Sequence, residues 1–142
     1  MSDRRRIAAV AVLLLVTLAS AACQRAGPVP PATHPVSGKA VGQGGASLAG
    51  GVVQFQSQQD SQLIALGDIQ ADGSFTLYTP FHGRQLPGAV EGPQQVTVIP
   101  PMTERQDAVP TTLLETYTVT KQGSHFEILF TTDGTSGGGR RR

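Results

Sequence analysis

Apolar and polar residues alternate in short stretches between residues 36 and 130. Alternation with a period of two is typical of β-strands that bury one face, and turn residues such as Gly, Pro, Asp and Ser separate the stretches. Beyond the N-terminal leader, no stretch has a convincing helical period. The pattern predicts seven short strands, within residues 36–40, 53–55, 63–69, 75–77, 96–98, 117–119 and 126–130.

Seven short strands with one apolar face each can bury those faces only against one another. We therefore expect an all-β fold, a seven-stranded β-sandwich of the transthyretin-like or immunoglobulin-like kind. Asp72-Gly73 lies between two of the strands and predicts a hairpin, because glycine accepts the positive φ that tight turns require. Residues 79–93 and 100–112 are rich in proline and polar residues, and we interpret both as surface loops.

The first 22 residues have the pattern of a secretory signal peptide. Arg4, Arg5 and Arg6 precede an apolar run over residues 7–19, and small residues follow over 20–22. Even when it is extended to Ala22, the apolar run spans about 24 Å as a helix, against a hydrocarbon core of about 30 Å. A stable transmembrane span is thus the weaker interpretation.

Cys23 follows these small residues directly and is the only cysteine in the chain. The stretch Leu18-Ala19-Ser20-Ala21-Ala22-Cys23 resembles the lipobox of bacterial lipoproteins, with Ser20 at a position where Leu is usual. The resemblance implies that Cys23 becomes the lipid-modified N-terminus, because a thiolate is needed to accept the diacylglyceryl group. Two alternatives stay open: a plain secretory signal, and a twin-arginine signal at Arg4-Arg5.

The mature chain is expected to have three parts. Residues 23–33 form a Pro-rich tether after the lipidated Cys23, because prolines at this density favour an extended spacer. Residues 34–131 form the β-sandwich. Residues 132–142, which combine glycines with Arg140, Arg141 and Arg142, form a disordered tail.

Composition and charge exclude several classes of protein. With 17 Gly, 10 Pro and only 15% charged residues in 142, a helical bundle is disfavoured. After removal of the leader, eight basic and nine acidic side chains remain, a net charge of −1, so we expect no nucleic-acid partner. One cysteine excludes an internal disulfide and any multi-cysteine zinc site.

Three segments together resemble the small carboxypeptidase regulatory-like domains, most closely those of planctomycete lipoproteins. The segments are residues 34–39 (His-Pro-Val-Ser-Gly-Lys), 48–55 (Leu-Ala-Gly-Gly-Val-Val-Gln-Phe) and 71–75 (Ala-Asp-Gly-Ser-Phe). Gly88, Gly92, Val96-Thr97-Val98 and the strand at 126–130 continue the match. The resemblance implies a transthyretin-like sandwich without catalytic residues. Gln94 stands where these domains usually carry an aromatic residue.

No constellation of residues in the sequence predicts catalysis, a metal or a cofactor. His34, His82 and His125 are far apart, and only Glu127 follows one of them closely enough to share a strand face. Residues 68–73 faintly resemble the start of a calcium loop, but a turn at Asp72-Gly73 explains them without an ion. A nucleophile-elbow motif is absent from the sequence.

These observations predict a lipid-anchored, extracytoplasmic β-sandwich, held at the cell membrane or outer membrane through Cys23. It would act as a non-catalytic structural or interaction module of the cell envelope, with a protein or a glycan as its partner. The alternative is a secreted carbohydrate- or peptide-binding module without a lipid. Sugar binding is weakened by the absence of Trp, which leaves Tyr78 and Tyr117 as the amphipathic rings.

Overall fold

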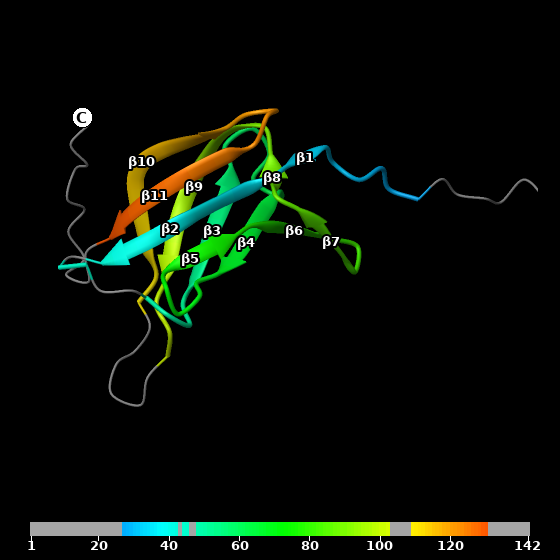
Figure 1. Ribbon diagram of the computed structural model, residues 1–142. Coiled ribbons are helices and arrows are strands. Elements are labelled where there is room, and N and C mark those ends of the chain that lie inside the picture. Colours follow the sequence, from blue (N-terminus) through cyan, green and yellow to red (C-terminus); the bar gives the residue numbers. More distant parts are fainter. Residues whose placement is uncertain (1–26, 43, 46–47, 103–108, 131–142) are drawn as a thin grey trace, which may run out of the picture. The chain divides into compact units, whose positions relative to one another are not determined.

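A computed structural model describes residues 27–42, 44–45, 48–102 and 109–130. These residues form eleven strands and no helix (Figure 1). The chain divides into two compact units, residues 1–30 and 31–142, and all eleven described strands belong to the second. The prediction of an all-β fold is confirmed.

Seven of the strands overlap the seven predicted stretches, and four are additional. The first group is β2 (Val36–Gly42), β3 (Val52–Ser57), β4 (Ile64–Asp68), β5 (Ser74–Thr76), β9 (Gly92–Ile99), β10 (Thr111–Val119) and β11 (Ser124–Phe130). The additional strands are β1 (Thr33–His34), β6 (Tyr78–Phe81), β7 (Arg84–Pro87) and β8 (Ala89–Val90).

Most of the strands lie in two sheets. The larger is antiparallel and has the order β10-β9-β3-β4-β6-β7. The smaller has the order β11-β2-β5, with β11 parallel to β2 and β5 antiparallel to it. In addition, β1 and β8 form a short antiparallel pair at the start of the unit. Figure 1 shows β2 and β11 lying across the larger sheet.

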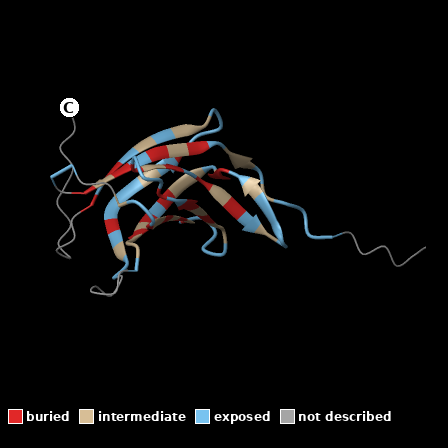
Figure 2. Cartoon of the chain, turned by 60° about the horizontal axis from the view of Figure 1, so that its bottom comes forward, coloured by how far each residue is buried: buried red, intermediate tan, exposed pale blue. Residues whose placement is uncertain are grey.

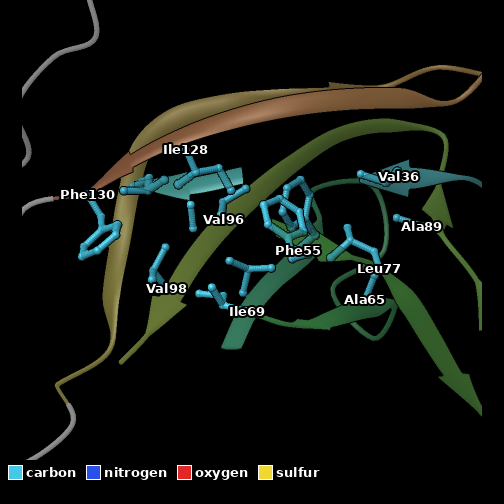
Figure 3. Packing of buried hydrophobic residues seen from close by; sticks show 14 of the residues in the cluster. Val36, Phe55, Ala65, Ile69, Leu77, Ala89, Val96, Val98, Ile128 and Phe130 are labelled. Carbon is cyan, nitrogen blue, oxygen red and sulfur yellow. The ribbon is translucent and has the colours of Figure 1, made fainter. Parts of the chain in front are cut away.

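The two sheets bury a common core (Figure 3). Phe55 on β3 is fully buried, and its ring lies 6.2 Å from that of Phe75 on β5 and 5.8 Å from that of Phe126 on β11. Red and pale-blue segments alternate along the strands in Figure 2, as expected when successive side chains point to opposite faces. Most of the residues predicted to face inward are buried: Val53, Phe55, Phe75, Leu77, Val96, Val98, Val119, Ile128 and Phe130.

The prediction that residues 79–93 form a surface loop is wrong, because they contain β7, β8 and parts of β6 and β9. Thr79 is buried, and its Oγ1 donates a 2.8 Å hydrogen bond to the carbonyl oxygen of Gly88. Pro87 lies on β7, an edge strand, where a missing N–H leaves no ladder bond unmade. Proline in this segment is thus compatible with strands.

The hairpin predicted at Asp72-Gly73 is half right. A tight turn forms there, with Gly73 N–H donating to Gln70 O at 2.9 Å and Gln70 N–H donating to Ser74 O at 2.8 Å. However, β4 and β5 belong to different sheets. The side chain of Ile69, which ends the run, is buried in the core, so the turn carries the chain from one layer to the other.

The loop predicted over residues 100–112 is right for the described positions before Thr111, which contain no strand. It is wrong at Thr111 and Thr112, because they pair with β9 and begin β10. In the tether, residues 27–32 have no regular secondary structure, and β1 begins at Thr33. The signal peptide (residues 1–22), Cys23 and the tail (residues 132–142) lie outside the described residues. Over the ranges that the structure describes, no apolar helix reaches the length that a bilayer requires.

Candidate functional site

The three histidines lie in separate places. His34 is on β1 opposite Ala89, and His125 is on β11 opposite Ser37. His82 occupies the turn between β6 and β7 with a φ of 44°, and its ring lies 4.6 Å from that of Phe81. In the described part of the chain, no three His, Cys, Asp or Glu residues come close enough to hold a metal ion. Cys23, the predicted lipidation site, lies outside this part.

A shallow open groove of about 400 Å³ lies where the parallel strands β2 and β11 begin. Its walls include Ser37, Thr76 and His125, together with the turn that precedes β11. The Oγ of Ser37 and the Nδ1 of His125 are 3.2 Å apart and hydrogen-bonded at the surface. The groove is thus open, its lining residues include no Asp, Glu, Lys or Arg, and more of its surface is apolar than polar.

The Ser37–His125 pair places a hydroxyl and an imidazole nitrogen, hydrogen-bonded to each other, at the surface. An activated serine needs a base that is itself oriented by a third group. Among the described residues, no carboxylate hydrogen bonds to His125, and Glu127 lies opposite Lys39, one pair further along the sheet face. This arrangement can hold a polar ligand group at the surface.

The stretch at residues 68–73, which faintly resembles a calcium loop, is closed by its own turn. The Asp72 carboxylate accepts hydrogen bonds from the Ser74 hydroxyl at 2.6 Å and from the Ser74 N–H at 2.9 Å. These bonds, the hydroxyl's first, lower the pKa of Asp72 below its ordinary value. Because the Asp72 carboxylate is hydrogen-bonded within the turn, the turn interpretation accounts for residues 68–73.

Gln94 has a structural role that the sequence analysis missed. It is almost fully buried on the core face of β9, and its Nε2 donates to the carbonyl oxygens of Val90 at 3.0 Å and Gly92 at 3.3 Å. The amide therefore ties β8 to the start of β9. The sequence contains a clue to this role, because Gln94 is two residues before Val96 and four before Val98 and therefore lies on the same strand face as these core residues.

Tyr117 is half-buried on β10 between two phenylalanine rings. Its ring lies 5.3 Å from that of Phe126, edge to face, and 6.1 Å from that of Phe55. Burial, followed by the nearby charge of Glu115 and a 3.5 Å hydrogen bond to it, raises the pKa of Tyr117 to about 12. The folded chain therefore favours the neutral phenol of Tyr117 over the charged phenolate.

This shift predicts a loss of stability at alkaline pH. Because the pKa of Tyr117 is higher in the folded chain than the ordinary value of 10.0, its contribution is intact below pH 10 and is lost as the pH rises towards 12. Urea unfolding between pH 9 and about 12 should show the Tyr117→Phe variant losing less stability than the wild type. If the wild type and the variant lose equal amounts of unfolding free energy over this pH range, the loss does not come from Tyr117.

The raised pKa of Tyr117 can also be measured directly by titration. The chain has two tyrosines, so the Tyr78→Phe variant retains Tyr117 alone. The ultraviolet absorbance of tyrosinate in that variant should titrate with a pKa near 12, and the urea-unfolded variant should titrate near 10. Titration of the folded variant at the unfolded value would show that Tyr117 is freely solvated.

Comparisons of the chain with protein-family models, with curated proteins and with solved structures each found no match. The resemblance to carboxypeptidase regulatory-like domains therefore stays a prediction that depends on the residues named above.

Proposed function

We propose that the protein is a lipid-anchored, extracytoplasmic β-sandwich that acts as a non-catalytic structural or interaction module of the cell envelope. One observation carries the proposal: the first strand of a compact β unit begins at Thr33, ten residues after the cysteine of a lipobox-like sequence. A cysteine placed there, directly after a basic and apolar leader, has the context that lipid modification requires.

The finer fold assignment, a transthyretin-like sandwich, is part of the same proposal. The six-stranded and three-stranded sheets share one core, which supports a two-layer arrangement. Gly38, from the segment that resembles carboxypeptidase regulatory-like domains, lies in the middle of β2 directly beneath the ring of Phe75. This packing gives a physical reason for a small residue in that segment.

The spacer limits how far the β unit can stand from its anchor. Ten residues of Pro-rich chain, extended at about 3.1 Å per residue, span roughly 31 Å. A lipid on Cys23 would thus hold the β unit within one domain diameter of the cell membrane or outer membrane. This distance suits a module that meets partners at the envelope surface.

Replacing Cys23 tests the anchor. The wild type should fractionate with membranes, and its intact mass should show an N-terminal residue 23 carrying acyl chains. The Cys23→Ala variant should lack the acyl mass, whether it accumulates as an uncleaved precursor or is released. Gln24→Ala, which changes the adjacent residue and keeps the thiol, is the matched control and should be acylated like the wild type.

Two outcomes of this experiment would overturn the anchor. A wild-type protein cleaved elsewhere, with an unmodified Cys23, would leave the secreted carbohydrate- or peptide-binding module as the better proposal. So would a Cys23→Ala variant that is cleaved normally and still fractionates with membranes.

A further inference from the structure

The outer face of the six-stranded sheet, the face turned away from the core, is almost without charge. On β3 and β9, the residues that alternate with the buried ones are Val, Ile, Gln, Thr and Pro. On β10 they are Thr112 before its bulge and Thr116 and Thr118 after it. On β4 they are Ile64, Leu66 and Asp68, and on β6 they are Tyr78 and Pro80. Among these outward residues of β3, β4, β6, β9 and β10, only Asp68, at the end of its strand, is charged.

Strand register aligns five of these outward residues in a row across the sheet, the cross-strand row. Tyr78 pairs with Leu66, Leu66 with Gln54, Gln54 with Thr97, and Thr97 with Thr112. With neighbouring strands about 4.8 Å apart, the row is roughly 19 Å long. It therefore crosses five adjacent strands, β6, β4, β3, β9 and β10, in the order in which they pair in the larger sheet (Figure 1).

The cross-strand row changes in chemistry along its length. One end is the aromatic ring of Tyr78 beside the apolar side chain of Leu66, both half-buried. The middle is the amide of Gln54, and the other end is a pair of hydroxyls, with the Oγ1 atoms of Thr97 and Thr112 3.0 Å apart. A second row beside it, with Gln56 between Ile64 and Gln95, repeats the mixture of apolar and amide groups.

We propose that this face binds a neutral, extended glycan that lies along the cross-strand row. A sugar ring has apolar C–H faces that stack on an aromatic ring, and hydroxyl edges that hydrogen bond to amides and hydroxyls. The outward residues supply both kinds of group in sequence. They supply almost no charge that would attract an ionic ligand.

A second protein chain is a poorer occupant of the same surface. Burial of amides and hydroxyls against a protein face costs free energy unless each finds a hydrogen-bond partner. A polyol carries a donor and an acceptor at each hydroxyl and can satisfy them all along the row. The spacing also agrees, since two strand-to-strand spacings add up to roughly 9.6 Å, close to the length of an extended β-linked disaccharide.

This inference deepens the proposed function, because it names the partner class for a module at the envelope. The experiment uses the full chain, processed in its host and solubilised in detergent. Its retention is measured by affinity electrophoresis in gels that contain soluble β-1,4-glucan, β-1,3-glucan or mannan, with alginate as the charged comparison. The wild type should be retarded by a neutral polysaccharide and not by alginate.

Three variants localise the binding. Tyr78→Ala removes the ring, and Thr112→Arg places a long charged side chain at the exposed end of the row; each should weaken binding about tenfold, the upper range for a lost aromatic stack. Leu129→Ala, on the exposed face of the other sheet, is the control and should bind within about twofold of the wild type. Thermal unfolding of each variant separates lost binding from lost structure.

Three results would overturn the inference. They are wild-type migration that no neutral polysaccharide retards, equal binding by all three variants, and a concentration-dependent dimer that Thr112→Arg disrupts. Because binding is measured in detergent, it does not depend on how the N-terminus was processed. An unmodified Cys23 would therefore refute the anchor and leave the glycan result standing.

Discussion

The Phe55→Ala variant should lose about 3–5 kcal/mol of unfolding free energy, the usual cost of deleting a fully buried aromatic ring. Phe55 is fully buried, and its ring contacts both sheets, with Phe75 on β5, Phe126 on β11 and Tyr117 on β10 as neighbours. A domain of this size has about 5–15 kcal/mol in total. This one substitution thus removes about a fifth or more of the stability.

The measurement is urea unfolding of residues 24–142, and the matched control is Phe81→Ala. Phe81 is only partly buried at the end of β6, and its ring contact is with the neighbouring His82, so the same chemical change should cost less than about 1 kcal/mol. Phe55→Leu keeps most of the apolar volume and should lose about half as much as Phe55→Ala. Equal losses at positions 55 and 81 would show that the two sheets do not share the core described here.

The strands with a clean period of two could be predicted from the sequence. On β11, for example, Ile128 and Phe130 point inward and Leu129 points outward, as the alternation requires. Local alternation decides such strands because one face must be buried whatever its partner is. Partners are another matter, since β11 lies beside β2 although almost ninety residues separate Ser124 from Val36. Nothing local encodes this parallel pairing.

Residues 79–93 show where local signals mislead. Pro80, Gly83, Pro87 and Gly88 read as breakers, yet each is compatible with the strands around it. Gly83 and Gly88 have positive φ values of 78° and 88° at the turns, and Pro87 lies on an edge strand. The segment is strand because Thr79 and Ala89 are buried in the common core, a tertiary fact that composition does not contain.

The proposed functional features divide in the same way. Cys23 could be identified from the sequence because a signal peptide is a linear motif. The cross-strand row could not, because its five members come from five strands, and only register brings Tyr78 beside Leu66 and Thr97 beside Thr112. The sequence does show that polar residues such as Gln54 and Thr97 alternate with core residues. Only the pairing of the strands shows that they form one uncharged surface.

Gly38 is a core position at which a single added methyl group should strongly destabilise the fold. It faces the core from the middle of β2, where a Cβ would overlap the carbonyl oxygen of Phe126 and lie 2.5 Å from Cζ of Phe75. The carbonyl belongs to β11, the parallel neighbour of β2, so it cannot withdraw without disturbing the pairing of β2 with β11. We expect Gly38→Ala to cost about 3 kcal/mol, the upper end for overpacking of a close-packed core.

Urea unfolding of residues 24–142 measures the loss, with Gly27→Ala as the matched control. A Cβ on Gly27 meets nothing within 4 Å, so this variant should be within about 0.5 kcal/mol of the wild type. If Gly38→Ala fails to fold, the double variant Gly38→Ala/Phe75→Leu removes the ring from the clash and leaves the carbonyl in place. Partial recovery in the double variant would assign the cost to both contacts. A stable Gly38→Ala single variant would mean that the ring of Phe75 and the carbonyl oxygen of Phe126 lie further from Gly38 than described here.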